Sequence, residues 1–165
     1  MIWRTPRSPP VISALGSAPL MVEARVRVIY GDTDQMGVVY YANYFRYFEL
    51  ARSEYFRAKG GSYRELEKEG RFLPVVEASC SFKAPARYDD VIVIRAEVTE
   101  VKRASLKFTY EVRRDGDLVL LCTGSTVHAC VGRDGKPVRI PEAVARVLDQ
   151  RDPRLDGSAG DRNRE

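Results

Sequence analysis

Residues 30–44 have the sequence YGDTDQMGVVYYANY and join two stretches of different hydrophobic periodicity. Before them, residues 22–30 alternate apolar and charged side chains, which predicts a half-buried strand. After them, aromatic and small residues recur at helical spacing, and this stripe predicts a long amphipathic helix. Asn43 is the expected N-cap and Gly60-Gly61 the expected stop, so the predicted helix has about 16 residues. The segment therefore lies between a strand and a helix.

The rest of the chain alternates with the period of strands. We expect strands near residues 76–82, 91–101, 106–112 and 117–131, with Asp115-Gly116 as a hairpin turn. Short helices are expected over residues 62–69 and from Pro141-Glu142 onward. One strand, one long helix and then four strands joined by short loops predict an α+β domain with an antiparallel sheet covering the helix.

The two ends of the chain differ from its middle. Residues 1–20 are rich in Pro, Ser, Gly and Ala, and Met21 precedes the first alternating segment, so we expect a disordered extension or a misplaced start. Residues 150–165 are polar and are expected to be a disordered tail. The folded domain should span residues 21–149. Its apolar runs are far shorter than the roughly 20 residues of a membrane-spanning helix, so no integral membrane segment is expected.

Composition excludes several classes of function. The net charge of +4 is spread along the chain without a basic run, so a nucleic-acid partner is not expected. Three cysteines without a C-x-x-C pair and the single histidine, His128, give no metal site. We expect His128 to be a hydrogen-bonded sheet residue, and the cysteines to be small buried side chains in a reducing cytoplasm. Acid–base chemistry must then come from carboxylates.

Asp32 and Asp34 are the acids that precede the long helix. Gly37 permits a backbone turn that other residues resist, and the helix start offers unpaired N–H groups with partial positive charge. A carboxylate facing such donors suits acyl transfer, because the acid attacks a carbonyl or activates water while the amides stabilise the oxyanion. Alternatively, both acids are only turn residues, for which Asp is well suited. Spacing alone leaves both interpretations open.

The motif G-D-T-D-x-x-G-V-V-Y-Y-A-N-Y resembles the signature of hot-dog-fold thioesterases. It is similar to the 4-hydroxybenzoyl-CoA thioesterase family, and specifically to its Tol-Pal-associated acyl-CoA thioesterase branch, the YbgC type. The resemblance covers roughly residues 22–145 and includes the segment FKAPARYDD at residues 82–90. It implies a hot-dog fold, in which an antiparallel sheet wraps around one long central helix.

The resemblance also implies residue roles. Asp34 matches the catalytic carboxylate, and the N–H of Tyr41 matches the group that polarises the thioester carbonyl. Many members of the Tol-Pal-associated branch carry a histidine where this chain has Tyr41, which leaves the substrate class open. A related hot-dog family uses a helix glutamate instead, so Glu49 and Glu54 are second choices.

The expected function is hydrolysis of acyl-CoA in the cytoplasm by a homodimer or homotetramer, with no metal and no cofactor. Gly37, Val38 and Tyr40 are expected to contact substrate. Lys102 and Arg103, beside Ser105, either bind CoA phosphates or form a solvated hairpin end. Two alternatives remain: a thioesterase acting on acyl carrier protein, and a non-catalytic module that binds acyl thioesters. Acyl length and aromatic preference are not determined by the sequence.

Overall fold

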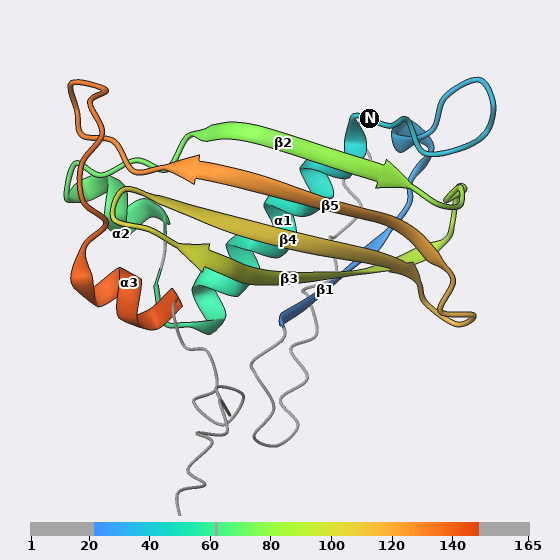
Figure 1. Cartoon of the computed structure of the whole chain (residues 1–165). Helices are drawn as coiled ribbons and strands as arrows, with labels where there is room; N and C mark the ends of the chain where they lie inside the picture. The colour runs from blue at the N-terminus through green and yellow to red at the C-terminus, as the bar shows by residue number, and fades with distance from the viewer. Residues whose placement is uncertain (1–21, 62, 149–165) are drawn as a thin grey trace, which may run out of the picture.

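The computed structural model describes residues 22–61 and 63–148. Five strands form one antiparallel sheet in the order β1-β3-β4-β5-β2, and α1 lies across one face of it (Figure 1). The elements are β1 (Val22–Arg27), the 3-10 turn η1 (Tyr30–Asp32), α1 (Asn43–Ala58), α2 (Tyr63–Lys68), β2 (Val75–Phe82), β3 (Val91–Val101), β4 (Ser105–Arg114), β5 (Leu120–Ala129) and α3 (Glu142–Leu148). The expected α+β architecture is confirmed, and the expected disordered ends, residues 1–20 and 150–165, lie outside the described residues.

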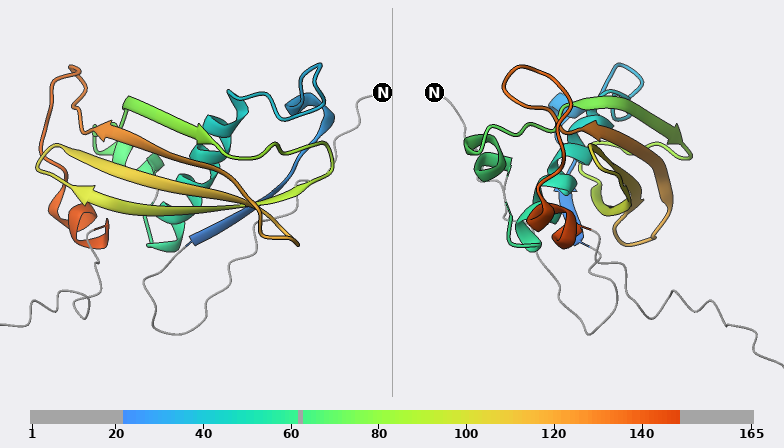
Figure 2. Two further views of the ribbon diagram at one scale, coloured as in Figure 1. Left: turned by 45° about the vertical axis from the view of Figure 1, so that its right-hand side comes forward. Right: turned by 60° about the vertical axis from the view of Figure 1, so that its left-hand side comes forward.

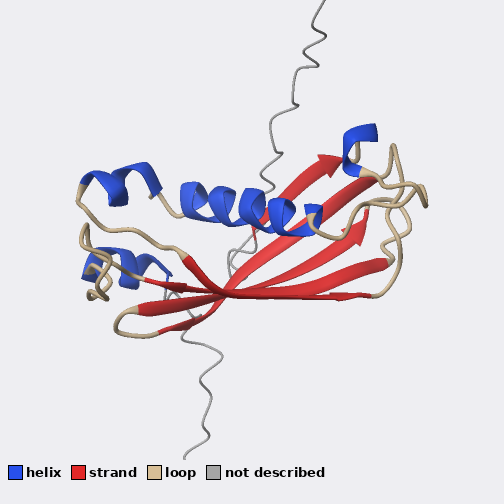
Figure 3. Cartoon of the chain, turned by 90° about the horizontal axis from the view of Figure 1, so that it is seen from above, coloured by secondary structure: helices blue, strands red, loops and turns tan. Residues whose placement is uncertain are grey.

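α1 lies along one face of the sheet (Figure 3), and aromatic side chains fill much of the contact between them. Phe48 is fully buried and stacks on Tyr110 of β4, with ring centroids 4.3 Å apart. The backbone of β5 approaches the same ring at Gly124, where a Cβ atom would lie 2.5 Å from Phe48. Only a residue without a side chain fits there, so Gly124 sets how closely the helix packs on the sheet.

The helix begins differently from the expectation. Ala42 rather than Asn43 occupies the N-cap, and its side chain forms no capping hydrogen bond. Asn43 is the first helical residue, and its Nδ2 donates to the Asp32 carbonyl oxygen at 2.8 Å. The prediction of Asn43 as the cap is therefore wrong, because this amide ties the helix start to the preceding loop instead. The predicted stop is confirmed: Gly60 has φ +79° and the Gly61 N–H donates to Phe56 at 3.0 Å.

In β4, buried and partly exposed side chains alternate. In β4, alternate side chains point at α1 and are buried: Leu106, Phe108, Tyr110 and Val112. β5 is shorter than the predicted 117–131, because Leu118 adopts φ +58° and the Asp117 carboxylate accepts the Val119 N–H. Among the described residues, no helix is both long and apolar enough to cross a bilayer.

β2 is an edge strand whose other side pairs with no strand of the described chain. Seven of its eight residues are exposed, including Val75, Val76 and Phe82. An exposed apolar edge of this length is an unusual liability for a soluble protein. It is a surface that a partner strand would cover.

Candidate active site

Asp34 lies in a tight turn between β1 and α1. Its N–H donates to the Val38 carbonyl at 2.9 Å, and its own carbonyl accepts the Gly37 N–H at 2.9 Å. Gly37 has φ +72°, the left-handed conformation that favours glycine. The Asp34 Oδ1 accepts the Met36 N–H at 2.8 Å, which makes an Asx turn. The side chain is half-buried, and no group of residues 22–61 or 63–148 donates to its Oδ2. One carboxylate oxygen holds the turn and the other is free.

Asp32 has the opposite surroundings. It is 5% exposed, and its Oδ2 accepts the Tyr47 hydroxyl at 3.0 Å and the Ile29 N–H at 3.3 Å. Arg46 lies 3.5 Å from its Oδ1. Burial, followed by the charge of Asp32, raises the pKa of Tyr47, so this phenol stays a donor. Asp32 therefore joins the loop to the helix, and both of its carboxylate oxygens have partners within the protein.

The start of α1 carries an unused backbone donor. The Asn43 N–H donates to Tyr40 and the Tyr44 N–H donates to the Tyr41 carbonyl. The N–H of Tyr41 has no acceptor among the described residues. It lies at the helix end where the aligned peptide dipoles place partial positive charge. A free N–H here is the kind of group that stabilises an oxyanion.

The loop is held against the segment that resembles the family's entry to the third strand. The Val39 N–H donates to the Ala86 carbonyl at 2.8 Å. Val38 and Arg87 form an isolated antiparallel β-bridge. The rings of Tyr40 and Tyr41 lie 4.5 Å apart and are half exposed. Asp34, Gly37, Val38, Tyr40 and Tyr41 are thus brought together in one loop.

Tyr44, in the first turn of α1, lies near the thiols of Cys80 and Cys122. Burial raises the pKa of Tyr44 to about 12. The sulfur atoms of Cys80 on β2 and Cys122 on β5 are 2.9 Å apart, and burial raises the pKa of both thiols. They are neutral side chains of the sheet, as expected, although Cys80 is only partly buried.

His128 is fully buried near the C-terminal end of β5. This end of the strand lies away from the Asp34 loop. Its Nε2 lies 2.8 Å from Thr126 Oγ1 and its Nδ1 lies 3.0 Å from the Leu73 carbonyl oxygen. Burial lowers its pKa to about 4, so the ring is neutral. The expectation of a hydrogen-bonded sheet histidine is confirmed.

Lys102, Arg103 and Ser105 lie at the other end of the sheet. They form the β3–β4 hairpin, and Figure 2 shows this hairpin at the opposite end from the Asp34 loop. Ten residue steps of β3 separate the two ends, roughly 33 Å. Lys102 Nζ is 3.0 Å from the Glu100 carboxylate. A single protomer therefore does not bring these residues to Asp34.

The two helix glutamates, Glu49 and Glu54, also lie away from the loop. Glu54 is buried and pairs with Arg57, while Glu49 is exposed beside a separate pocket. Within the described part of the chain, no three His, Cys, Asp or Glu side chains gather as a metal site.

An antiparallel sheet packed around one long helix is the arrangement of the hot-dog class of α+β proteins, and this chain adds an acidic turn before the helix. The chain belongs to the thioesterase superfamily, whose family model matches residues 36–121. A Haemophilus influenzae protein named acyl-CoA thioesterase YbgC is 38% identical over 122 residues, which is 72% of this chain and 88% of the relative. A 4-hydroxybenzoyl-CoA thioesterase from a Pseudomonas strain is 30% identical over 129 residues, 74% of this chain and 92% of the relative.

Solved structures agree with the fold. A hypothetical protein from Thermus thermophilus superposes with a TM-score of 0.72 and 40% identity, over 76% of this chain and 95% of that one. The resemblance to the family and to its YbgC-type branch is therefore confirmed, and so is the hot-dog fold.

Proposed function

We propose that this thioesterase hydrolyses acyl-CoA to a free acid and CoA, with Asp34 as the reacting carboxylate and the N–H of Tyr41 as the oxyanion donor. The single observation that carries the proposal is the pairing of two unused groups in one loop. The Oδ2 of Asp34 and the N–H of Tyr41 both lack partners among the described residues. The relatives named acyl-CoA thioesterase support the substrate class.

Two routes use the same atoms. In one, Asp34 attacks the thioester carbon and forms an anhydride, the C–S bond breaks to release CoA thiolate, and water then hydrolyses the anhydride. In the other, Asp34 takes a proton from water as the water attacks the carbonyl carbon; the tetrahedral intermediate then breaks its C–S bond and releases CoA thiolate, to which Asp34 returns the proton. In both, negative charge develops on the carbonyl oxygen, where the Tyr41 N–H and the positive end of α1 stabilise it. His128 takes no part in either route, because it is buried and hydrogen-bonded elsewhere.

The proposed enzyme is a homodimer formed along β2. Antiparallel pairing of two β2 strands about a two-fold axis would cover the exposed edge. It would also place the start of one β2 beside the end of the other, so each β3–β4 hairpin would approach the partner's acidic loop. Lys102, Arg103 and Ser105 could then bind the CoA phosphates of a substrate that reacts at the other protomer's Asp34. We propose that the reaction takes place in the cytoplasm.

The charge of Asp34 distinguishes an enzyme from a module that only binds acyl thioesters. Asp34→Asn keeps the side chain's size and its Asx turn but removes the negative charge and the basicity. If Asp34 reacts, turnover should fall by about a hundredfold or more, because general-base assistance alone contributes about 10²–10⁴-fold. The measurement is release of free thiol from short-chain, long-chain and aromatic acyl-CoAs, with the same acyl groups on acyl carrier protein tested in parallel.

Glu49→Gln is the matched control, because it makes the same acid-to-amide change on α1, outside the loop. It should keep normal turnover. Asp32→Asn should lower the free energy of unfolding, because it disturbs a buried set of hydrogen bonds, but should cost much less turnover in the folded protein. Near-normal turnover of Asp34→Asn, combined with its loss in Glu49→Gln, would refute the assignment. Normal acyl-CoA binding with no hydrolysis by the wild type would favour the binding module.

A further inference from the structure

Asp34 lies near the tip of a small hairpin, residues 32–40, that precedes α1. Thr33 and Val39, one on each arm, form an isolated antiparallel β-bridge. The hairpin closes at its base, where the Tyr40 N–H donates to the Asp32 carbonyl oxygen at 2.8 Å. The first arm follows β1, and the second arm continues into α1. The angle between this hairpin and the helix therefore decides where the Asp34 carboxylate lies.

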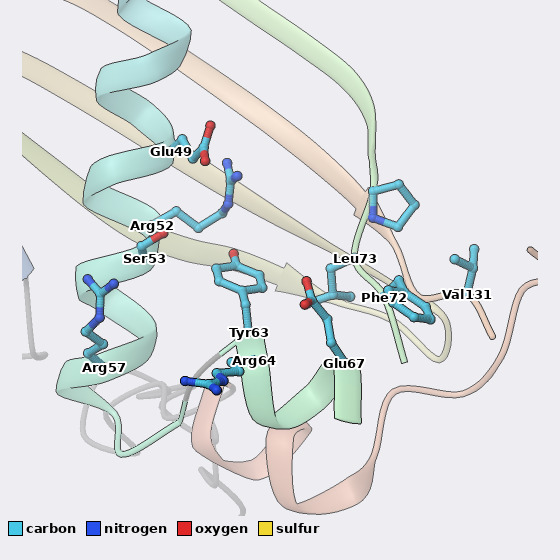
Figure 4. A pocket seen from close by; sticks show the side chains of 11 residues that line it. Glu49, Arg52, Ser53, Arg57, Tyr63, Arg64, Glu67, Phe72, Leu73 and Val131 are labelled. Carbon is cyan, nitrogen blue, oxygen red and sulfur yellow. The ribbon is translucent and has the colours of Figure 1, made fainter. Parts of the chain in front are cut away.

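The tip of the hairpin has little packing that could hold this angle. Residues 35–37 are exposed, and Met36 has 76% of its surface exposed. α1, by contrast, packs along its length. Phe48 stacks on Tyr110 of β4, and farther along the guanidinium of Arg52 lies 5.8 Å from the ring centre of Tyr63 on α2 (Figure 4). The helix is the fixed part, so the position of the hairpin depends on a few hydrogen bonds.

The side chain of Asn43 bonds from the helix to the first arm of the hairpin. Its Nδ2 donates to the Asp32 carbonyl oxygen at 2.8 Å, so this oxygen accepts from both Tyr40 and Asn43. A carbonyl oxygen has two lone pairs and can hold both donors. The orientation of the amide follows from its other partner, because Oδ1 accepts from Arg46 Nη1 at 3.2 Å and a guanidinium has only donors. The side chain therefore braces the hairpin against the first turn of α1.

The backbone of Asn43 holds the peptide that carries the proposed oxyanion donor. The Asn43 N–H donates to the Tyr40 carbonyl at 2.9 Å. This carbonyl and the Tyr41 N–H belong to one peptide group, and in a planar trans peptide they point in opposite directions. Fixing the carbonyl therefore fixes the direction of the Tyr41 N–H. Asn43 is thus bonded both to the arm that leads to Asp34 and to the peptide that carries the donor.

The carboxylate of Asp32 also joins the loop to α1, but it holds other groups. It accepts from the Tyr47 hydroxyl and from the Ile29 N–H, and Arg46 lies beside it. None of these bonds reaches the peptide that carries the Tyr41 N–H. The Asp32 side chain therefore fixes the buried start of the loop, whereas Asn43 connects the two groups proposed to react.

We propose that Asn43 is a positioning residue for the thioester hydrolysis, and that its side-chain amide sets the distance between the Asp34 carboxylate and the Tyr41 N–H. This role rests on the function proposed above for those two groups. Asn43 needs no contact with the reacting atoms, because it acts through the angle of the hairpin. The effect can be large, since a misplacement of about 1 Å can cost about 10²-fold in rate.

Steady-state release of free thiol from acyl-CoA by the full chain tests this role. Asn43→Ala removes the side-chain donor, keeps the backbone N–H and adds no charge. Its kcat should fall about tenfold to a hundredfold while its KM changes little, because positioning acts on the transition state more than on binding. Thr33→Ala is the matched control. The Thr33 hydroxyl also donates to a backbone carbonyl, that of Tyr30, but this bond does not reach α1, so the control should keep the wild-type kcat.

Asn43→Asp separates positioning from helix stability. A carboxylate has the size of the amide and suits the first turn of a helix, here beside Arg46, so this variant should be as stable as the wild type. An ionised carboxylate has no proton to donate to the Asp32 carbonyl, so kcat should fall as it does in Asn43→Ala. The neutral alanine variant shows that charge is not the cause, and the aspartate variant tests the role even if the alanine variant does not fold.

Amide ¹⁵N relaxation of the full chain gives a readout without substrate. In the wild type, the amides of Asp34 and Tyr41 should have order parameters near about 0.85, as in rigid backbone, and in Asn43→Ala they should fall toward about 0.6. The amide of Phe48, within α1, should not change. Normal turnover in Asp34→Asn would refute the proposed function, whereas the order parameters report on the hairpin whether or not Asp34 reacts.

Four results would each overturn the positioning role. They are unchanged order parameters of the hairpin in Asn43→Ala, a raised KM with a normal kcat in that variant, a wild-type kcat in Asn43→Asp, and an equal loss of kcat in Thr33→Ala.

Discussion

Two aspartates only two residues apart perform different tasks because their surroundings differ. Asp32 is buried, and both of its carboxylate oxygens have partners. One accepts hydrogen bonds from a phenol and a backbone N–H, and the other lies beside an arginine. One Asp34 oxygen accepts a hydrogen bond from its own turn, and the other accepts none from the described residues. The sequence predicts two acids at the helix start but does not distinguish them by spacing. The difference between the two acids depends on Tyr47, which follows Asp32 by fifteen residues. From the first turns of α1, its hydroxyl donates a hydrogen bond to Asp32.

The buried histidine makes stability depend on pH. The pKa of His128 falls from 6.5 to about 4 on folding, so the unfolded chain binds a proton more readily than the folded one. Stability contributed by neutral His128 is complete above the unfolded pKa and is lost as the pH falls from about 6.5 to about 4. Between pH 7 and pH 5 this group should cost about 2 kcal/mol of unfolding free energy.

His128→Gln isolates this effect. The variant should be less stable at pH 7, since it disturbs two buried hydrogen bonds, but its stability should fall less steeply toward pH 5. Urea unfolding of both proteins at the two pH values measures the difference. Parallel pH profiles for the wild type and the variant would show that His128 does not titrate between the two states.

At the level of secondary structure, the contact between α1 and β5 shows what periodicity can and cannot predict. The helical stripe predicts a helix of about 16 residues that follows an N-cap at Asn43, and α1 spans Asn43–Ala58. Alternation predicts the inward side chains of β4. The same patterns could not reveal that Asn43 bonds across the loop to Asp32, since this contact depends on how the 3-10 turn folds. Nor could they reveal why position 124 is glycine, because the neighbours that exclude a side chain come from α1 and β2.

Gly124→Ala tests this packing. The added Cβ would lie 2.5 Å from Phe48 ring atoms and 2.6 Å from the Ser79 carbonyl oxygen, and neither can move without displacing the helix or the edge strand. The free energy of unfolding should fall by about 1–3 kcal/mol or more. Gly31→Ala is the control, because the nearest atom to its Cβ is 4.0 Å away and its φ is not positive. It should change stability by less than about 0.5 kcal/mol, and equal losses in both variants would refute the packing argument.

Across the whole molecule, the acidic loop and the β3–β4 hairpin lie at opposite ends of one sheet, although residues of both are predicted to contact a single substrate. Sequence order could not predict this separation, because it follows from the antiparallel course of β3. The exposed edge of β2 could bring the two groups together in a dimer. Two-fold pairing of the β2 strands would place the β3–β4 hairpin of one protomer at the same end as the acidic loop of the other. The predicted folded span, residues 21–149, contains every element of this arrangement, and the dispensability of residues 1–20 and 150–165 stays a prediction.

Val76→Lys tests the proposed assembly. Val76 is 56% exposed on the edge strand, so a lysine there should leave the stability of the protomer nearly unchanged but should oppose strand pairing, as charged residues do on natural sheet edges. In light scattering coupled to size exclusion, the wild type should appear as a multiple of the 18.7 kDa chain, and the variant as 18.7 kDa. Turnover of acyl-CoA should fall with it, because the partner's hairpin no longer reaches the substrate. Leu118→Lys, which replaces an equally exposed apolar residue outside β2, should change neither mass nor turnover. A monomeric wild type, or a fully active monomeric variant, would mean that Asp34 works without the partner and that Lys102 and Arg103 do not bind its substrate.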